Sequence, residues 1–406
     1  MFKIKKLRLV NFRGFTDTTI EFDDRITCIA GINGAGKSSV LQALSKILES
    51  LDATLPTHSY ITENDFNKNI KNPKVKIELD YLLGNAVCEK KITSEGIFSI
   101  QEDSFLNYKK THDLIISYYS VNRSDLDLDI TIDKGKDLSA KSEAMTNAFN
   151  SVTRYKEFFQ WFRDREDREN AIKLEKYEKG DVQKIYEDTE LKAVRNAISA
   201  LTPDFSKMKI DSNRQTIIVT KENATLDFST LSDGEKAIIT LFGDIARRLA
   251  IVNEKLENPL DGNGIILIDE IDLHLHPSWQ RKICRALVET FPNCQFVVTT
   301  HSPQILGELK TSEIWLLNNF DAYRPDSSYG VSTNDILDEI MNVFENDKSL
   351  SRNGEIAELL SNVSKLIELE KFSDAKKAIA QIESKIGGEI HETVKYKTII
   401  ETLETE

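Results

Sequence analysis

The chain has 406 residues, of which 53 are Lys or Arg and 66 are Asp or Glu, so its formal net charge is −13. Hydrophobic residues make up 40% of the sequence and charged residues 29%, a balance typical of a globular protein with ample core. With 17 glycines and 8 prolines, the chain is neither collagen-like nor dominated by linkers. The negative charge argues against a uniformly basic nucleic-acid coat but leaves a local basic groove open.

Cysteine usage and the N-terminus favour a reducing compartment. Cys28, Cys88, Cys284 and Cys294 show no CxxC spacing, so we expect buried free thiols rather than disulfides or zinc. The N-terminus, MFKIKKLRLVNF, alternates charged and apolar residues and lacks the apolar core of a signal peptide. No apolar run reaches the ~18 residues of a membrane span. We therefore expect a cytoplasmic protein without a membrane partner.

Strands dominate the first third of the chain. Alternating or continuous apolar residues predict strands over 4–9, 18–22, 25–30, 74–101 (as an antiparallel meander) and 114–119. A glycine-bearing loop follows the third of these segments. After this loop, apolar residues at helical spacing predict a helix over 37–51.

Helices are more frequent in the rest of the chain. Charge and helix formers over about 140–202 predict a helical insertion. Beyond it we expect a hairpin over 216–228, a long helix over 233–256 and a buried strand over 265–268. A helix over 280–290, strands over 295–299 and 313–317, and a helical tail from about 354 should follow.

A phosphate-binding motif lies between the predicted strand 25–30 and helix 37–51. Residues 31–38, GINGAGKS, match G-x-x-x-x-G-K-[ST]. Glycines let backbone N–H groups converge on phosphate oxygens, and the helix N-terminus adds partial positive charge. Lys37 would contact the β- and γ-phosphates, and the Ser38 hydroxyl would bind Mg²⁺. The expected nucleotide-binding residues are Asn33, Gly34, Ala35, Gly36, Lys37, Ser38 and Ser39.

Two acidic residues and a histidine follow buried strands. Asp269 and Glu270 end the run IILIDE, and the carboxyl ends of parallel strands face a ligand crevice. Asp269 would hold Mg²⁺, directly or through water, and Glu270 would take a proton from attacking water. His301 ends the next apolar strand, where it could polarise the γ-phosphate. We therefore expect Lys37, Glu270 and His301 to act in catalysis.

The segment LSDGEK opens the long helix predicted from Asp233. Ser232 is the predicted N-cap, and Glu235 completes a capping box. The capping box is a sufficient structural reason for the presence of both residues. A helix N-terminus with a glycine and a hydroxyl is also an anion site, which suggests a second molecule approaching the nucleotide from the other side.

Four motifs, GINGAGKSS, LSDGEK, IILIDE and TTH, occur in this order. Together they resemble the ABC-class ATPase heads of the RecF, Rad50 and OLD-like group. NFRGF around Arg13, DLHLHP from Asp272 and an insertion before the signature helix support the resemblance. It implies an α/β fold with a mixed, largely parallel P-loop sheet, an antiparallel β subdomain, a helical insertion and a helical C-terminal region.

The same resemblance implies hydrolysis of ATP with Mg²⁺ between two heads. Two protomers would sandwich two ATP molecules, with Lys37 and Asp269 from one protomer and Ser232 and Gly234 from the other. Asp272 would lie at this interface. The protein would therefore form a head-to-head dimer or a higher oligomer.

The resemblance has consequences for three further segments. Arg13 of NFRGF would contact the nucleotide. The family's Q-loop glutamine is not evident, and Asn122 or Arg123 lies at the expected place. His274 and His276 are not expected to bind zinc, because no third ligand is spaced nearby.

The motifs predict four regions. Residues 1–124 would form the N-terminal part of the head, and 125–215 a helical insertion or arm lobe. Residues 216–320 would complete the head, and 321–406 would form a helical region for partner binding or oligomerisation. The apolar stripes of this last region fit a self-packed bundle or a docking platform equally well.

The helix around 157–166 resembles that of small defence ATPases of the PtuA family, found in Septu anti-phage systems and with some retrons. Its aromatic residues are also explained as the core of the lobe. We find no HNH motif or nuclease constellation, so the resemblance implies a separate HNH nuclease subunit like PtuB. DNA would bind directly or through that partner. The alternatives are a RecF- or Rad50-like DNA-repair ATPase and a nucleotide-gated scaffold with little turnover, which the intact Glu270 disfavours.

Overall fold

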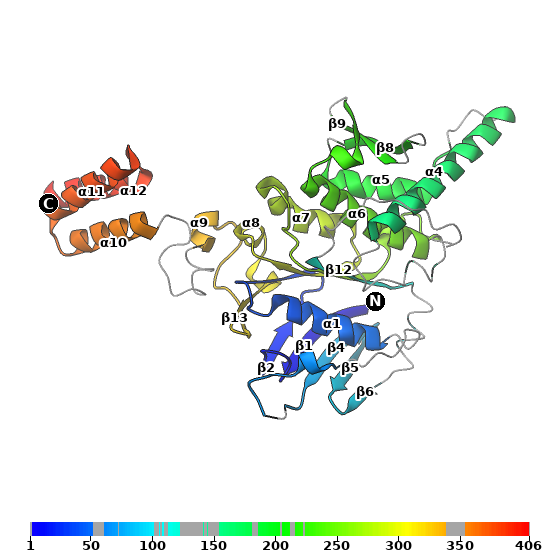
Figure 1. Cartoon of the computed structure of the whole chain (residues 1–406), viewed down its shortest axis with the longest axis horizontal. Coiled ribbons are helices and arrows are strands. Elements are labelled where there is room, and N and C mark those ends of the chain that lie inside the picture. The colour runs from blue at the N-terminus through cyan, green and yellow to red at the C-terminus, as the bar shows by residue number, and fades with distance from the viewer. Residues whose placement is uncertain are drawn as a thin grey trace. The chain divides into compact units, whose positions relative to one another are not determined.

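A computed structural model gives the fold of the chain (Figure 1). It describes residues 2–51, 61–71, 73–100, 105, 108, 113–121, 141, 144, 154–180, 186–203, 205–211, 216–221, 224–337 and 354–405. The chain divides into two compact units, Met1–Gly330 and Val331–Glu406. None of the helices that the structure describes is both long and apolar enough to cross a membrane. All four cysteines are buried and free, as predicted.

A six-stranded sheet forms the centre of the first unit, with the strand order β14-β13-β3-β12-β11-β7. The five parallel strands are β3 (Ile26–Gly31), β7 (Ile115–Tyr119), β11 (Gly264–Ile268), β12 (Cys294–Thr300) and β13 (Ile314–Asn318). The edge strand β14 (Asp321–Tyr323) pairs antiparallel with β13. Because β3, β11 and β12 are adjacent and parallel, the residues after their carboxyl ends meet at one edge.

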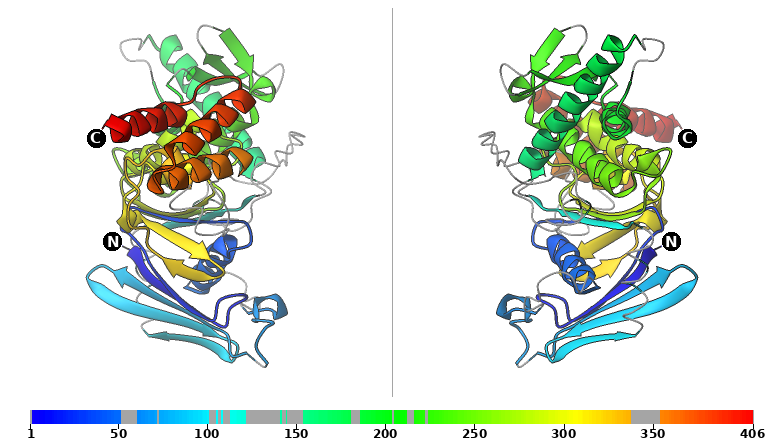
Figure 2. Two further views of the ribbon diagram at one scale, coloured as in Figure 1. Left: turned by 90° about the vertical axis from the view of Figure 1, so that its left-hand side faces the viewer. Right: turned by 90° about the vertical axis from the view of Figure 1, so that its right-hand side faces the viewer.

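An antiparallel sheet lies on the other side of the helix α1 (Lys37–Leu51). Its order is β2-β1-β4-β5-β6, with bounds Asp17–Glu21, Phe2–Val10, Lys76–Leu83, Ala86–Thr93 and Gly96–Ile100. The helix contacts β4 and β5 of this sheet and β3, β11 and β12 of the central sheet, so it lies between them (Figures 1 and 2). Apolar residues of α1 and both sheets form one buried cluster. The burial of α1 on two sides fixes the start of the helix relative to the edge of the central sheet.

Gln295 on β12 joins the two sheets through hydrogen bonds. Its side-chain oxygen accepts from the backbone N–H of Ile4 at 2.9 Å, and its nitrogen donates to the carbonyls of Ile4 and Asp23 at 2.9 and 2.8 Å. The pairing of β1 with β4 is irregular between Ile4 and Lys6. This buried amide therefore satisfies backbone groups of Ile4 beside a break in the ladder.

A lobe of helices and strands precedes and surrounds the long helix α6 (Asp233–Val252). It contains α4 (Arg154–Glu178), α5 (Thr189–Leu201) and a three-stranded sheet of β8 (Phe205–Asp211), β9 (Thr216–Lys221) and β10 (Ala224–Asp227). Helices α4 and α5 both contact α6. The aromatic side chains of α4, from Phe158 to Phe162, are buried, as expected for the core of a lobe. The predicted helical insertion or arm lobe up to 215 also contains the strand β8, which was not predicted because its apolar and polar residues alternate only weakly.

Two helix ends differ from prediction for local reasons. Helix α6 ends at Val252 rather than near Leu256. The side chain of Asn253 donates to the Leu249 carbonyl at 3.0 Å, which completes the helix C-terminus in place of a further turn. Helix α7 (Pro277–Thr290) begins three residues earlier than predicted, with His276 as its N-cap and proline at its first position.

The remaining short elements lie between the longer helices and strands of the head. They are the helix α8 (Pro303–Leu306) and the 3₁₀ helices Glu63–Asp65, Phe228–Thr230, Pro259–Asp261 and Thr311–Glu313. Strand β14 and the residues up to Gly330 group with the head, so the predicted boundary at 320 cuts through its sheet.

The second unit begins with the short helix α9 (Thr333–Asp335) and contains three longer helices, α10 (Gly354–Glu368), α11 (Phe372–Ile386) and α12 (His391–Thr405). They share a small apolar core built from Leu360, Val363, Ala375, Ala378, Ile379, Ile382 and Ile400. Most of the predicted apolar stripes are thus covered within the unit. Leu369, Ile386, Val394 and Leu403 stay exposed.

A fully buried charge cluster joins the central sheet to α6. Asp244 accepts hydrogen bonds from Tyr119 of β7 at 2.9 Å, from Arg247 at 2.7 Å and from Arg248 at 2.8 Å. Asp244 and both arginines are fully buried. A buried ion pair is costly to break, because removing one partner leaves an uncompensated charge.

We expect Asp244→Asn to lower the free energy of unfolding by about 3–5 kcal/mol, because two buried guanidinium groups lose their carboxylate. Denaturant unfolding measures this difference. The matched control is Asp164→Asn, since Asp164 pairs with Arg163 at the surface with 55% of its side chain exposed; this change should cost about 1 kcal/mol or less. Equal losses in the two variants would contradict the prediction.

Candidate active site

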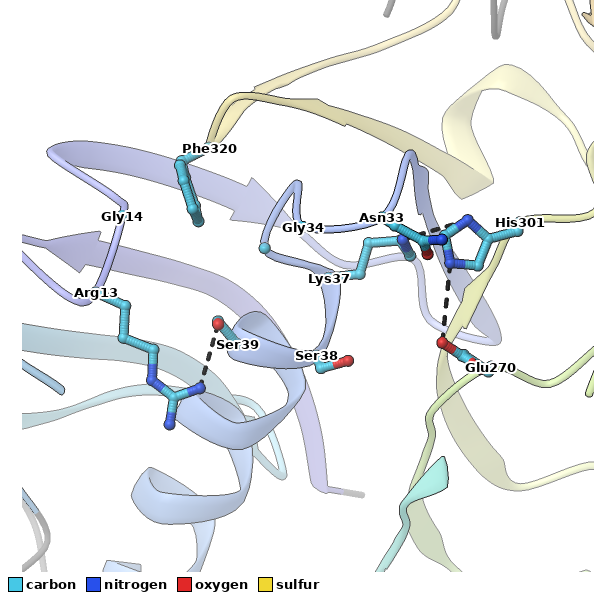
Figure 3. Close-up of a pocket in the computed structure, with 11 residues that line it drawn as sticks. Arg13, Gly14, Asn33, Gly34, Lys37, Ser38, Ser39, Glu270, His301 and Phe320 are labelled. Carbon is cyan, nitrogen blue, oxygen red and sulfur yellow. Dashed lines mark hydrogen bonds and ion pairs between the residues drawn. The ribbon is translucent and has the colours of Figure 1, made fainter. Parts of the chain in front are cut away.

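The loop between β3 and α1 forms the floor of a cleft of about 280 Å³ (Figure 3). Most of the predicted phosphate-loop residues line this cleft, together with two of the three predicted groups from the neighbouring strand ends, Glu270 and His301. The lining residues are Arg13, Gly14, Asn33, Gly34, Gly36, Lys37, Ser38, Ser39, Glu270, His301 and Phe320. Ala35, which belongs to the same loop, has a buried side chain and does not line the cleft.

The loop needs glycine at its tightest point. Gly36 has φ +105°, and a Cβ there would lie 2.7 Å from the Phe15 ring and 2.8 Å from the Phe320 ring. A larger residue is therefore excluded both by backbone conformation and by space. The helix that begins at the next residue directs its free N–H groups toward the cleft, which makes the loop fit for phosphate.

Lys37 is held by the loop itself. Its ammonium donates to the carbonyls of Gly31 and Ile32, both at 2.9 Å, and lies 3.5 Å from Nδ1 of His301. Burial lowers the pKa of Lys37 to about 8, although the carboxylates of Glu270 and Asp269 oppose this shift. Burial and the nearby Lys37 charge also lower the pKa of His301, so the imidazole is neutral at pH 7 and can accept a hydrogen bond.

ATP affinity should fall about tenfold between pH 7 and pH 9, the factor by which the protonated fraction of an amine of pKa 8 decreases. The reason is that the ammonium, not the amine, attracts phosphate, so affinity is lost as the pH rises through about 8. Titration calorimetry at both pH values measures the change. In Lys37→Arg the guanidinium stays charged, and the pH dependence should largely disappear. Equal wild-type affinities would contradict the assignment.

Thr299 places the two acidic residues after β11. Its hydroxyl donates to Asp269 Oδ1 at 2.5 Å and accepts from the backbone N–H of Glu270 at 2.7 Å. Glu270 has φ +47°, an uncommon conformation for this residue. Its carboxylate lies 3.9 Å from Nε2 of His301, and Figure 3 shows both side chains at the same end of the cleft. The strain and the hydrogen bond fix the direction of the Glu270 side chain.

Asp269 is buried beside the cleft. Besides Thr299, it forms a hydrogen bond with the hydroxyl of Tyr118, and burial raises the pKa of that tyrosine. Ser38 lines the cleft. Hydroxyl and carboxylate oxygens are the ligands that Mg²⁺ prefers, often with intervening waters. Ser38 and Asp269 could therefore hold the ion, Asp269 most simply through a water because its oxygens already accept hydrogen bonds.

Arg13 lines the other end of the cleft. Its guanidinium donates to Ser39 Oγ at 3.2 Å and to Asp65 Oδ1 at 3.1 Å. Asp65 also pairs with Lys46 at 2.9 Å, and its side chain is fully buried. Burial by itself raises the pKa of Asp65, but hydrogen bonds from Thr62 and Lys46 outweigh it and lower the pKa. The charged Asp65, which sequence analysis missed, therefore orients Arg13.

The predicted signature residues and the D-loop, which is the segment DLHLHP from Asp272, do not contribute to the lining of this cleft. Ser232, Gly234 and Asp272 are absent from its lining. The Ser232 hydroxyl and the Glu235 carboxylate form the predicted capping box. A Cβ on Gly234 would lie 2.5 Å from the carbonyl oxygen of His274, so this glycine lets the D-loop pack on the start of α6 within one protomer.

Asp272 forms hydrogen bonds with the last residue of β12 and with His301, which follows that strand. Its Oδ1 accepts from the Thr300 hydroxyl at 2.5 Å and from the His301 backbone N–H at 3.4 Å. These two hydrogen bonds connect Asp272 to the end of β12 and to the backbone of His301. Among the residues that the structure describes, no group of three His, Cys, Asp or Glu side chains could hold a metal. Asn122 and Arg123 lie outside the described residues.

The parallel sheet, phosphate loop, acidic strand end and signature helix together define an ATPase of the ABC class. Two family models agree, since residues 2–197 match AAA_15, an AAA ATPase domain, and residues 115–307 match AAA_21, an AAA domain. The chain is 28% identical to "Retron Ec83 probable ATPase" of Escherichia coli, over 98% of this chain and 86% of that protein. It is 29% identical to "Retron Vc95 probable ATPase" of Vibrio cholerae, over 90% of this chain and 84% of that protein.

A third relative is the Septu protein PtuA of Bacillus thuringiensis, 24% identical over 85% of each chain. The protein is therefore an ABC-class ATPase that is similar to the ATPases of retrons and to PtuA. This confirms the family resemblance drawn from the motifs.

Proposed function

We propose that this ATPase is the regulatory subunit of a prokaryotic anti-phage defence complex and controls a separate nuclease. The observation that carries the proposal is the similarity to retron and Septu ATPases along almost the whole chain, 98% of it for one relative. The similarity therefore extends past the head motifs into the insertion and the C-terminal unit.

In the proposed reaction the phosphates of ATP lie along the loop from Asn33 to Ser39. Lys37 exchanges its bonds to the loop carbonyls for bonds to phosphate oxygens. Glu270 accepts the proton of the attacking water, and the neutral His301 beside it orients that water or the γ-phosphate. Mg²⁺ bound by Ser38 and Asp269 would supply charge neutralisation at the phosphates.

The second part of the proposal is a head-to-head dimer. Ser232 and Asp233 are exposed at the N-terminus of α6, a ready anion site, yet they do not line the cleft of their own protomer. A second protomer could bring this N-terminus to the γ-phosphate. Gly234 and the D-loop, which contact each other within one protomer, would approach the nucleotide together.

The third part is a separate nuclease of the HNH type. The part of the chain that the structure describes contains no group of three His, Cys, Asp or Glu side chains that could hold a metal. The C-terminal unit has exposed apolar residues on a bundle with its own core, which makes it a candidate docking element.

A co-purification tests the proposal. Tagged Glu270→Gln protein is expressed with its native neighbouring genes, and the complex is isolated with ATP and magnesium and identified by mass spectrometry. We expect a stoichiometric small nuclease. Lys37→Ala, prepared in the same way, is the control for dependence on nucleotide.

The same experiment separates the alternative. Nucleic acid or repair proteins in place of a nuclease would favour a RecF- or Rad50-like role. In that case the purified ATPase should bind DNA alone, with an affinity that falls steeply with salt.

A further inference from the structure

We propose that Phe320 stacks on the base of the bound nucleotide and so selects nucleoside triphosphates over other polyphosphates. The residue lies in the two-residue turn between β13 and β14, and its ring lines the cleft. This inference rests on the ATPase activity of the chain and is independent of the nuclease partner and of the dimer.

The position of Phe320 matches the base end of the cleft. Glu270 and His301 mark the end where the γ-phosphate reacts, and Figure 3 shows Phe320, Gly14 and Arg13 on the opposite side of the phosphate loop. A triphosphate that extends from Glu270 along the loop directs its sugar and base toward this side. There the ring of Phe320 lines the cleft, and an aromatic ring is a group that binds planar aromatic systems. The guanidinium of Arg13, which Ser39 and Asp65 hold, adds positive charge on the same side.

The backbone of Phe320 is strained. Asn319 has φ +47° and Phe320 has φ +70°, the conformation of a type I′ turn, in which glycine is favoured at the second position. A bulky residue there costs on the order of 1–3 kcal/mol, and such strain gathers at functional sites. A glycine would serve the turn better, so the turn alone does not account for phenylalanine.

The surroundings of the ring are shaped to hold it over the cleft. A Cβ on Gly14 would lie 2.2 Å from the ring, and a Cβ on Gly36 would lie 2.8 Å from it. Phe15 contacts the ring edge-on, with centroids 5.2 Å apart, and the Phe320 carbonyl accepts from Thr18 at 2.9 Å. Two glycines and these contacts fix the ring, while Phe320 remains partly exposed toward the cleft.

Stacking predicts a particular selectivity. Every base has a π-face, so stacking tolerates base identity, and ATP and GTP should depend on Phe320 alike. Inorganic tripolyphosphate has no base and should not depend on it. A purely structural role for Phe320, as cover for Phe15, would instead affect every ligand of the loop.

The test measures the Kd of ATP and of tripolyphosphate for the full chain and its variants by calorimetry with magnesium. In Phe320→Leu we expect the Kd of ATP to rise about tenfold and the Kd of tripolyphosphate to stay within about twofold. Phe320→Tyr keeps the ring and should bind ATP like the wild type. Gly14→Ala keeps the Phe320 residue, but the added methyl group would displace its ring, so this variant should also weaken ATP binding selectively.

Either of two results would overturn the inference: unchanged ATP affinity in Phe320→Leu, or an equal loss for ATP and tripolyphosphate in folded protein. The melting temperature of each variant, measured without ligand, shows whether the fold is retained, and Gly14→Ala decides the matter where Phe320→Leu is unstable. The ATP affinity and turnover of the wild type are measured in the same experiment and do not depend on the result for the Phe320 variants. Failure of this inference therefore leaves the ATPase assignment intact.

Discussion

Glu270→Gln should bind ATP as tightly as the wild type but hydrolyse it at least about a hundredfold more slowly, the lower end of what a general base contributes. Glutamine has the same shape and keeps the backbone N–H bond to Thr299, so the strained turn is retained. Its amide cannot take the proton of the attacking water. With hydrolysis blocked, the ATP-bound dimer that we propose should accumulate.

Phosphate release measures hydrolysis in this variant, and calorimetry measures binding. Light scattering with ATP, compared with ADP, reports the dimer. The matched control is Glu289→Gln on α7, where the glutamate is exposed and pairs, among the residues that the structure describes, with Arg285 on its own helix; its turnover should be unchanged. Near-normal hydrolysis by Glu270→Gln would mean that another group, for which His301 is the nearest candidate, takes the proton.

Contiguous motifs made the phosphate end of this site predictable. The loop 31–38 carries glycines, lysine and serine at fixed spacing because one backbone segment must wrap one phosphate chain. The acidic pair after β11 was equally predictable, since a run of aliphatic residues that ends in carboxylates is typical of a buried parallel strand whose carboxyl end reaches a ligand. The bounds of α1 were predicted at both ends, because the motif marks its start and its buried stripe continues to Leu51.

Apart from Arg13, to which the family resemblance pointed, the base end was not predictable, because it is built from contacts between distant segments. Arg13 meets Asp65 across 52 residues, and Thr18 meets the Phe320 carbonyl across 302. The dipeptide Asn318–Asn319 between a strand and a short polar stretch does indicate a turn. Which side chain of that turn enters a cleft depends on the order of strands in the sheet, with β13 beside β3, and no local pattern encodes that order.

Buried charges escaped prediction for the same reason. Asp244, Arg247 and Arg248 look like the solvated face of a helix in the sequence, at i, i+3 and i+4. They are buried because α4 and α5 cover α6, and Tyr119 completes the cluster from β7. Tyr118, its neighbour on the opposite face of the strand, contacts Asp269. One strand thereby contacts both the predicted magnesium ligand and the signature helix.

Ser232→Arg should bind ATP normally and lose hydrolysis almost completely, because the change lies outside the cleft of its own protomer and would obstruct the cleft of the other. The arginine also removes the N-cap bond to Glu235, at a cost of about 1 kcal/mol to the helix. Ser229→Arg, at an exposed serine three residues earlier, adds the same charge without touching the cap and should hydrolyse ATP normally.

Mixing two inactive variants gives the sharpest form of this test. Lys37→Ala should bind ATP poorly, and Ser232→Arg should bind it without turnover, so neither is active alone. In a mixed dimer one cleft combines Lys37 from the Ser232→Arg protomer with Ser232 from the Lys37→Ala protomer, and that cleft is intact. Hydrolysis should return on mixing, at most to half the activity per dimer. Normal hydrolysis by Ser232→Arg alone would contradict the dimer model. Ser232 would then not be needed in the cleft of the other protomer, and each head would hydrolyse ATP by itself.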